Sequence, residues 1–351
     1  LSYPERAAKI MKLYLEEFSE EELLGFAQKA YGPAKFDTPA AAPVVQLADN
    51  TYIQELWHGP TCAFKDMALQ MLPYLLTASL KKTGEEKTVC ILVATSGDTG
   101  KAALEGFRKE QEGYMYPSFE TIAGYGPHGA IVHYSATPET DIPVKPEGLL
   151  LVDSGGQYMG GTTDITRTIA LGPLTKEEKQ AFTIVLESML ALLTFRFPKG
   201  CAGFNLDAIA RAPFWSRGMD YNHGTGHGVG YMLSVHEGPN GIRGQRRVKS
   251  EDAAFAPGMI TSDEPGIYIE GKYGVRHENL MECVEAEPGS RYLEFRPITF
   301  APIDLDAIDE ETLTEATRRQ LNAYHKEVYE RLAPNMREEE LSWLREYTRE
   351  I

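Results

Sequence analysis

The fold is decided by residues 222–237, which read Asn222-His223-Gly224-Thr225-Gly226-His227-Gly228-Val229-Gly230-Tyr231-Met232-Leu233-Ser234-Val235-His236-Glu237. Three histidines and four glycines are concentrated in this stretch. Each glycine inside a helix costs about 1 kcal/mol relative to alanine, so a helix is not expected here. The pattern favours an extended backbone that carries imidazoles into a cavity. A glycine-rich turn with incidental histidines is the alternative interpretation of the stretch taken alone.

The composition of the whole chain excludes several classes of protein. The chain has 351 residues, 42% of them hydrophobic, which suits one large domain or two of ordinary size. Its formal net charge of −16 repels phosphate backbones, so no nucleic-acid partner is expected. No apolar run is long enough for a membrane span, and the charged amino terminus is not signal-like. Four widely spaced cysteines without a CxxC pair indicate reduced thiols in a cytoplasmic protein.

The first third of the chain has an alternating helix and strand pattern. Helices are expected at 2–18, 19–32 and 66–81, strands at 44–47, 52–57 and 88–94, and a further helix from Lys101. The loop Thr95-Ser96-Gly97-Asp98-Thr99-Gly100 precedes that last helix. Such a loop is typical of an anion cradle at a helix amino terminus, although an ordinary strand-to-helix turn has the same pattern.

This loop accompanies a second motif, His58-Gly59-Pro60-Thr61-Cys62-Ala63-Phe64-Lys65-Asp66. Together the two resemble the amino-terminal part of threonine synthase, a pyridoxal-phosphate enzyme, over residues 1–107. The resemblance implies that Lys65 forms the Schiff base and that residues 95–100 contact the cofactor or substrate. No Gly-Gly-Gly-Asn phosphate loop follows, so a complete pyridoxal phosphate site is not expected and Lys65 is interpreted as an ordinary lysine.

From residue 108 onward the pattern indicates an α+β fold. Strands are expected at 116–125, 129–134, 149–152 and 162–169, and as a hairpin over 258–284 that turns near Glu270-Gly271. Helices are expected from Thr175 to Leu193, at 206–211 with an end at Pro213, at 309–333 and at 338–346. Alternation in the fourth strand places Asp164, Thr166 and Thr168 on one face. Antiparallel hairpins with helices on one side are typical of α+β proteins.

Five residues on separate strand-like segments have the chemistry of metal ligands: Asp153, Asp164, His227, Glu264 and Glu278. A single buried carboxylate is usually a locally paired structural group. Four of them with a histidine could share a core only if cations neutralised their repulsion. Carboxylates with one imidazole favour Mn²⁺, Co²⁺ or Zn²⁺. Two such ions would generate a bridging hydroxide near neutral pH and polarise a carbonyl.

The segments that carry these residues also resemble a known family. They are Val152-Asp153-Ser154-Gly155, Thr163-Asp164-Ile165-Thr166-Arg167-Thr168, His223-Gly224-Thr225-Gly226-His227-Gly228, Val235-His236-Glu237-Gly238-Pro239, Asp263-Glu264-Pro265-Gly266 and Arg276-His277-Glu278-Asn279. Over residues 108–351 they resemble the Xaa-Pro aminopeptidases (aminopeptidase P) of the pita-bread metallopeptidases. The resemblance implies a pita-bread domain with a carboxy-terminal helical extension, after a fragment at 1–107 like part of a pyridoxal-phosphate enzyme.

The same resemblance assigns roles to the ligand positions. Asp153 and Asp164 would bind two divalent ions, with manganese expected first, and Asp164 would bridge them. His227 and Glu264 would complete one ion, and Glu278 would bridge as well. Glu264 would also accept the proton of the attacking water.

Four further residues are implied around these ligands. His133, His223 and His236 would line the substrate site, although His133 taken alone could be a core histidine. Arg276 lies two residues before Glu278, so we hypothesise that it holds a ligand carboxylate.

The expected function is hydrolysis of the amino-terminal bond of peptides with proline in second position. The two resemblances meet between Ala103 and Arg108, inside one expected helix. Relatives carry creatinase-like domains before this point, and a fusion without them is expected to expose apolar patches and to form homo-oligomers. Three alternatives stay open: a prolidase acting on dipeptides, a metal-free binding module, and an inactive fusion with a vestigial pyridoxal-phosphate lysine.

Overall fold

The structure is a computed structural model that describes residues 1–62, 64–84, 113–137, 139–245 and 253–351. The chain divides into two compact units, Leu1–Tyr114 with Ala136–Asp141, and Met115–Ser135 with Ile142–Ile351. The predicted junction near 103–108, the strand at 88–94 and the loop at 95–100 lie outside the described residues.

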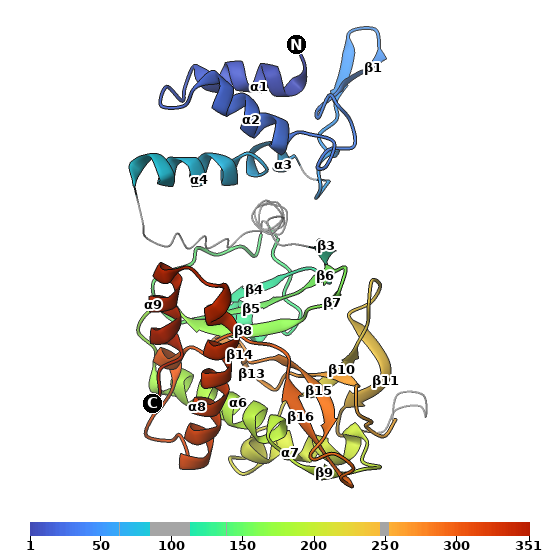
Figure 1. Cartoon of the computed structure of the whole chain (residues 1–351), viewed down its shortest axis with the longest axis vertical. Helices are drawn as coiled ribbons and strands as arrows, with labels where there is room; N and C mark the ends of the chain where they lie inside the picture. Colours follow the sequence, from blue (N-terminus) through green and yellow to red (C-terminus); the bar gives the residue numbers. More distant parts are fainter. Residues whose placement is uncertain (63, 85–112, 138, 246–252) are drawn as a thin grey trace. The chain divides into compact units, whose positions relative to one another are not determined.

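The first unit contains helices and a hairpin in its described part (Figure 1): α1 (Tyr3–Lys12), α2 (Glu20–Ala30), β1 (Val44–Ala48), β2 (Thr51–Gln54), α3 (Asp66–Leu69) and α4 (Leu72–Thr83). The predicted capping box of Ser19 and Glu22 starts α2. Helix α1 ends at Lys12, earlier than predicted, because the Lys12 ammonium bonds the carbonyls of Glu16 and Phe18 and stabilises a turn instead.

The second unit combines antiparallel sheets with long helices, which confirms the α+β prediction (Figure 1). Its strands are β3 (Tyr114–Pro117), β4 (Ile122–Tyr125), β5 (Leu149–Ser154), β6 (Gly156–Tyr158), β7 (Gly161–Thr162), β8 (Ile165–Ala170), β9 (Phe197–Pro198), β10 (Gly226–Val229), β11 (His236–Ile242), β12 (Ile260–Asp263), β13 (Gly266–Ile269), β14 (Tyr273–Arg276), β15 (Asn279–Glu285) and β16 (Tyr292–Pro297). Its helices are α6 (Lys176–Leu193), α7 (Gly203–Trp215), α8 (Glu315–Leu332) and α9 (Glu338–Tyr347), with single turns η1 (Gly126–Ala130), η3 (Leu305–Ala307) and η4 (Ala333–Asn335).

Two sheets of the second unit position the site. One has the strand order β11-β10-β12-β15-β16-β9, and the other has the order β4-β5-β8. The extended backbone predicted for residues 222–237 is confirmed in part: β10 and the start of β11 pair antiparallel, whereas the residues between them form a bend with Met232 in the left-handed region at φ 65°. Hairpin β13–β14 forms a separate ribbon.

Helix α6 lies in the middle of the hydrophobic core. Thr175 and Glu178 form its predicted capping box, and the predicted stripe from Phe182 to Leu193 is buried. Twelve of its 18 residues are buried, because α6 packs against α7 and α8, against β13 and β14 of the ribbon, and against β12 and β16 of the six-stranded sheet. A helix covered on most sides needs apolar residues around most of its circumference.

Several predicted elements differ from the structure, among them the helix end at Pro213 and the strand at 129–134. Helix α7 continues past Pro213 to Trp215, because the Ser216 hydroxyl and the Arg217 guanidinium both donate to the Pro213 carbonyl and stabilise the last turn. Residues 129–134 form no strand: Gly126, in the left-handed region at φ 52°, starts the turn η1 and a loop follows.

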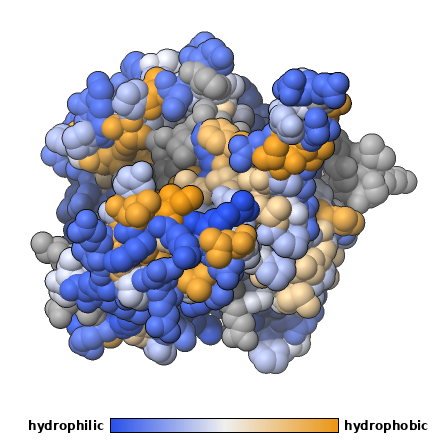
Figure 2. Space-filling view, turned by 90° about the horizontal axis from the view of Figure 1, so that it is seen from above, coloured by the Kyte–Doolittle hydropathy of each residue, from blue (hydrophilic) through white to orange (hydrophobic). Residues whose placement is uncertain are grey.

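The surface carries apolar side chains in both units. Figure 2 shows apolar patches between polar ones on one face of the molecule, and exposed large apolar residues include Leu47, Tyr52 and Leu233. Cys62, Cys201 and Cys283 are free thiols. Within the described ranges, no helix combines the length and the apolar character that crossing a bilayer requires.

Candidate active site

The hairpin that runs from β12 to β15 is interrupted once on each strand, and these two interruptions position Glu264 and Glu278. Asp263 pairs with Asn279 at the end of β12, and Gly266 pairs with Arg276 at the start of β13. The skipped residues are Glu264-Pro265 on one strand and His277-Glu278 on the other. Both glutamates therefore lie between strands, and the prediction that each lies within a strand of one hairpin is wrong. Pro265 has no N–H to donate to a ladder, which explains why pairing stops here.

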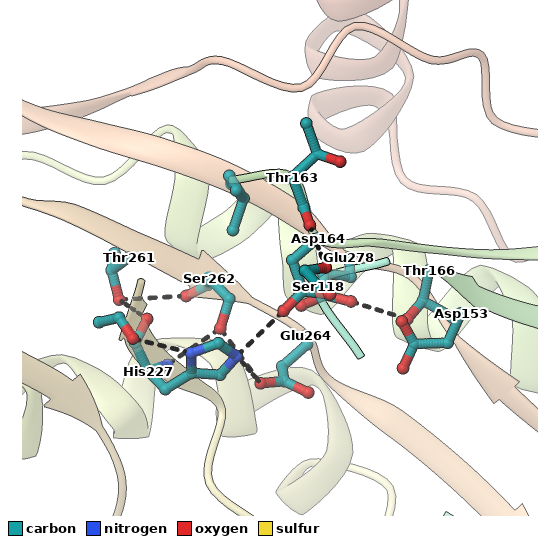
Figure 3. A network of polar contacts seen from close by, with 12 residues as sticks. Ser118, Asp153, Thr163, Asp164, Thr166, His227, Thr261, Ser262, Glu264 and Glu278 are labelled. Carbon is teal, nitrogen blue, oxygen red and sulfur yellow. Dashed lines mark hydrogen bonds and ion pairs between the residues drawn. The ribbon is translucent and has the colours of Figure 1, made fainter. Parts of the chain in front are cut away.

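The neighbouring β5–β8 pair supplies the two aspartates. Asp153 lies near the end of β5 and Asp164 directly before β8. Asp164, Thr166 and Thr168 are buried on one face, which confirms the alternation read from the sequence. The Thr166 hydroxyl donates to Glu278 Oε2 at 2.7 Å, so the two sheet segments are joined at the carboxylates (Figure 3).

His227 is held on β10 with one ring nitrogen facing the carboxylates (Figure 3). A Cβ at either flanking glycine would overlap a carbonyl oxygen of a neighbouring strand, which explains the Gly-His-Gly sequence. Nδ1 lies 3.0 Å from the Gly228 carbonyl, which can only accept, so Nδ1 carries the proton. Nε2 lies 3.4 Å from Asp164 Oδ2 and 3.5 Å from Glu264 Oε1.

One cavity of about 300 Å³ brings the sequence-predicted ligands together: Asp153, Asp164, His227, Glu264 and Glu278 all line it, with His133, His236 and Arg276. Asp164, His227 and Glu278 each offer a ligand atom within 4.8 Å of the others. The second oxygen of Asp153, Oδ1, is buried and has no hydrogen-bond partner among the described residues.

The electrostatics of the cavity favour cations. Burial, followed by repulsion from the neighbouring carboxylates, raises the pKa of Glu278 well above its ordinary value. Burial also raises the pKa of Glu264, to about 7, and that of Asp153. Burial alone would lower the pKa of His227, but its bond to Asp164 and the charge of Glu264 outweigh burial and raise it. Carboxyls crowded at low dielectric are stabilised by protons or by metal ions.

A buried arginine holds one ligand in place, as we hypothesised. Arg276 donates from Nη2 to Asp153 Oδ2 at 2.8 Å and from Nη1 to the Tyr268 hydroxyl at 2.9 Å. Its Nε donates to the Thr166 hydroxyl at 3.2 Å. Arg276 thereby fixes Asp153 directly and Glu278 through Thr166.

His223 extends this network. Burial lowers its pKa to about 4, so the ring is neutral at pH 7. Nδ1 lies 2.7 Å from the Gly224 carbonyl and therefore carries the proton. Nε2, 2.9 Å from the Tyr268 hydroxyl, must then accept, so Tyr268 donates to His223 while it accepts from Arg276.

The other two histidines, His133 and His236, also line the cavity. The His236 ring stands nearly perpendicular to that of His227, with centroids 4.1 Å apart. His133 lies in the loop after η1. All four histidines, His133, His223, His227 and His236, line an adjoining groove of about 870 Å³.

Sequence reasoning missed two contributors, Ser262 and Tyr268. The Ser262 hydroxyl donates to Glu264 Oε1 at 3.1 Å and accepts from the His227 amide at 2.9 Å. Ser262 lies in β12 two positions before Glu264, so the period-2 spacing of that strand was a usable signal, whereas Tyr268 lies beyond the break at Pro265 and had no local signal.

Lys65 belongs to the first unit, whereas the candidate metal ligands belong to the second. It precedes α3, and its ammonium lies 5.6 Å from the centroid of the Phe64 ring. Its predicted companion loop at 95–100 is outside the described residues.

Comparison with known proteins identifies the class that has this fold and cavity. The sequence model of metallopeptidase family M24 matches residues 86–285, more than half of the chain. The model of the C-terminal region of peptidase M24 matches residues 291–351. The chain belongs to metallopeptidase family M24, and the pita-bread fold predicted for its larger part is the fold of that family.

Individual relatives are named as proline-directed aminopeptidases. A probable Xaa-Pro aminopeptidase P of Paracoccidioides brasiliensis (strain Pb03) is 43% identical over 255 residues, 71% of this chain and 41% of the relative. Aminopeptidase P1 of Arabidopsis thaliana is 40% identical over 283 residues, 79% of this chain and 43% of the relative.

A solved structure shows the same similarity. The X-prolyl aminopeptidase of Caenorhabditis elegans, described as a cytosolic enzyme with a di-nuclear active site, superposes with a TM-score of 0.67 and 34% identity. The match covers 73% of this chain and 42% of that one. The chain thus spans about two fifths of the length of these relatives.

Proposed function

We propose that this chain is a metallo-aminopeptidase that hydrolyses the amino-terminal Xaa-Pro bond of peptides with proline in second position. The observation that carries the proposal is that one cavity brings together the carboxylates of Asp153, Asp164, Glu264 and Glu278 and the imidazole of His227. The names of the relatives, each an Xaa-Pro or X-prolyl aminopeptidase or an aminopeptidase P, support the substrate class.

We propose that Asp153, Asp164, His227, Glu264 and Glu278 would together hold two divalent ions. The residues fit such ions, because Asp153 Oδ1 is buried without a hydrogen-bond partner and His227 Nε2 faces the carboxylates without a proton in the neutral ring. Oxygen ligands with one imidazole favour Mn²⁺, and Zn²⁺ or Co²⁺ fit as well. Bound ions would supply an activated water near neutral pH and polarise the scissile carbonyl.

The protein groups supply proton transfer and orientation. Glu264 faces the cavity beside His227 and is suited to accept the proton of the attacking water, and the Ser262 hydroxyl, which donates to its Oε1 at 3.1 Å, orients it. Both nitrogens of His223 are bonded, so its ring presents carbon atoms that suit contact with a proline ring. We assign His133 and His236, which also line the cavity, to binding of the substrate and of its developing charge.

The test combines metal content with peptide cleavage. Purified protein should bind two Mn²⁺ per chain and release alanine from Ala-Pro-Ala but not from Ala-Ala-Ala. Asp164→Ala should abolish both properties, because the cavity loses the carboxylate that faces His227 and lies beside Glu278. Full activity of Asp164→Ala would exclude this site.

A prolidase acting on dipeptides is the second candidate. The groove of about 870 Å³ beside the cavity favours longer peptides, since a dipeptide would leave much of it unused. Faster cleavage of Ala-Pro than of Ala-Pro-Ala would favour the prolidase.

We also propose that residues 1–107 form a threonine synthase-like fragment joined to the metallopeptidase domain at 108–351. In this fusion, Lys65 would be what remains of a pyridoxal phosphate site whose other residues have been lost. We place the protein in the cytoplasm, in keeping with the cytosolic nematode relative, and expect a homo-oligomer. A native mass of the purified full chain that is a multiple of 39.0 kDa would support a homo-oligomer.

A further inference from the structure

An arginine of β8 connects the candidate metal centre with the carboxy-terminal region. Arg167 bonds four backbone carbonyls: Nη1 donates to those of Thr166 at 2.9 Å and Glu278 at 2.7 Å, Nη2 to that of Ala301 at 2.9 Å, and Nε to that of Pro302 at 3.1 Å. A guanidinium has five N–H donors in a rigid, planar fork. A shift of any one acceptor therefore moves the guanidinium and, with it, its bonds to the other acceptors.

The position of Glu278 is fixed by Arg167 and by the preceding residue, Thr166. Its amide donates to the Thr166 carbonyl at 3.0 Å, and its carboxylate accepts from the Thr166 hydroxyl at 2.7 Å. Its carbonyl accepts from Arg167. The backbone and the side chain of Glu278 are therefore both fixed by two consecutive residues of β8, which directly follow Asp164 and Ile165 in the chain.

Tyr324 of α8 completes the arrangement from the carboxy-terminal side. Its hydroxyl accepts from Arg167 Nη2 at 3.0 Å and lies 3.0 Å from the Ala301 carbonyl and 3.1 Å from that of Thr299. The residue is 4% exposed. Arg167 Nη2 also donates to Asn279 Oδ1 at 2.7 Å, so the Tyr324 hydroxyl is one of three acceptors that fix this end of the guanidinium. Without the hydroxyl, two acceptors would remain and the fork would be held less tightly in its buried setting.

We propose that Arg167 and Tyr324 are positioning residues for the carboxylate of Glu278, so that the carboxy-terminal region controls how tightly the centre holds its ions. The inference rests on the proposed function in taking Glu278 as a metal ligand. The partners that orient a ligand affect metal affinity because a displaced ligand no longer matches the coordination geometry.

The substitution Tyr324→Phe isolates the hydroxyl, since the buried ring is kept. Tyr329→Phe is a matched control on the same helix: its hydroxyl accepts from Arg345 Nε at 3.1 Å, so the control also loses a bond to an arginine. Arg167→Lys is a second variant that keeps the charge and loses the fork.

The experiment is a calorimetric Mn²⁺ titration of the full chain after removal of metals, with thermal unfolding of the metal-free variants alongside. Tyr324→Phe should weaken Mn²⁺ binding about tenfold and Arg167→Lys by more, in the range found for residues that orient metal ligands. Tyr329→Phe should stay within about twofold of the wild type.

Unchanged affinity in Tyr324→Phe, even with a lower melting temperature, would overturn the inference, and so would equal weakening in Tyr329→Phe. A wild type that binds Mn²⁺ without cleaving Xaa-Pro peptides would contradict only the proposed activity, because the affinity ratios would still be measured. A wild type that binds no ion would overturn both.

Discussion

His227 is the residue around which the charges of the cavity are arranged. Its Nδ1 is bonded to a carbonyl, and its Nε2 faces Asp164 and Glu264. The carboxyls around it have raised pKa values because they are buried together. The metal-free protein therefore keeps protons in the cavity near neutral pH, and a metal ion must displace them.

This proton uptake predicts an unusual pH dependence of stability. The folded protein raises the pKa of Glu264 from 4.5 to about 7, so it binds that proton more tightly than the unfolded chain does. The free energy of unfolding of the metal-free protein should fall as pH rises through this range, by up to about 3 kcal/mol from Glu264. The melting temperature after EDTA treatment should be lower at pH 8 than at pH 5.

Two measurements test whether the proton on Glu264 causes this pH dependence of stability. Mn²⁺ should raise the melting temperature more at pH 8, where it replaces fewer protons. Glu264→Gln should flatten the pH dependence, because the amide does not titrate. A metal-free protein that becomes more stable between pH 5 and pH 7 would contradict the prediction.

The candidate ligands could be read from the sequence because each lies in a short motif that resembles those of the Xaa-Pro aminopeptidases. The hydroxyls of Tyr268 and Tyr324 could not be read in the same way. Their roles depend on which acceptors other segments bring within reach, and Tyr324 bonds an arginine 157 positions earlier in the chain. Local pattern carries no information about such pairings.

Among the elements, β10 shows how backbone spacing fixes a side chain. It pairs with β11 and β12, and the adjacent strands approach too closely for any side chain at Gly226. A Cβ there would overlap the Ser262 carbonyl, which is backbone and cannot rotate away.

Gly226→Ala should therefore destabilise the fold by about 1–3 kcal/mol, as overpacking does elsewhere. The midpoint of urea unfolding should fall accordingly. Gly160→Ala is the control, since no atom lies within 4 Å of a Cβ placed there. Equal midpoints for the two variants would show that the strands can separate without cost.

Most elements followed their local patterns, and the exceptions have local causes. The capping boxes at Ser19 and Thr175 start helices as expected. Pro213 does not end α7, because side chains further along bond its carbonyl. The ladder stops at Pro265, which has no N–H to donate, and this interruption was not predicted.

For the whole molecule, the two units lead to separate expectations. The metal-ligand candidates all belong to the second unit, and Lys65 belongs to the first. Lys65→Ala should leave Mn²⁺ affinity and Ala-Pro-Ala cleavage within about twofold of the wild type, as surface substitutions usually do. Pyridoxal phosphate added to the wild type should give no imine absorption band, and a band that Lys65→Ala removes would show that the first unit binds the cofactor.

The two breaks in the hairpin have a consequence for motion. Strands β12 and β15 belong to the six-stranded sheet, while β13 and β14 form their own ribbon, and the chain passes between them at Glu264-Pro265 and His277-Glu278. Ions bound by both glutamates would cross-link the ribbon to β8 and β10 through Asp164 and His227. Amide hydrogens of β13 and β14 should then exchange with deuterium more slowly in the Mn²⁺-loaded protein, while those of α9 keep their rate.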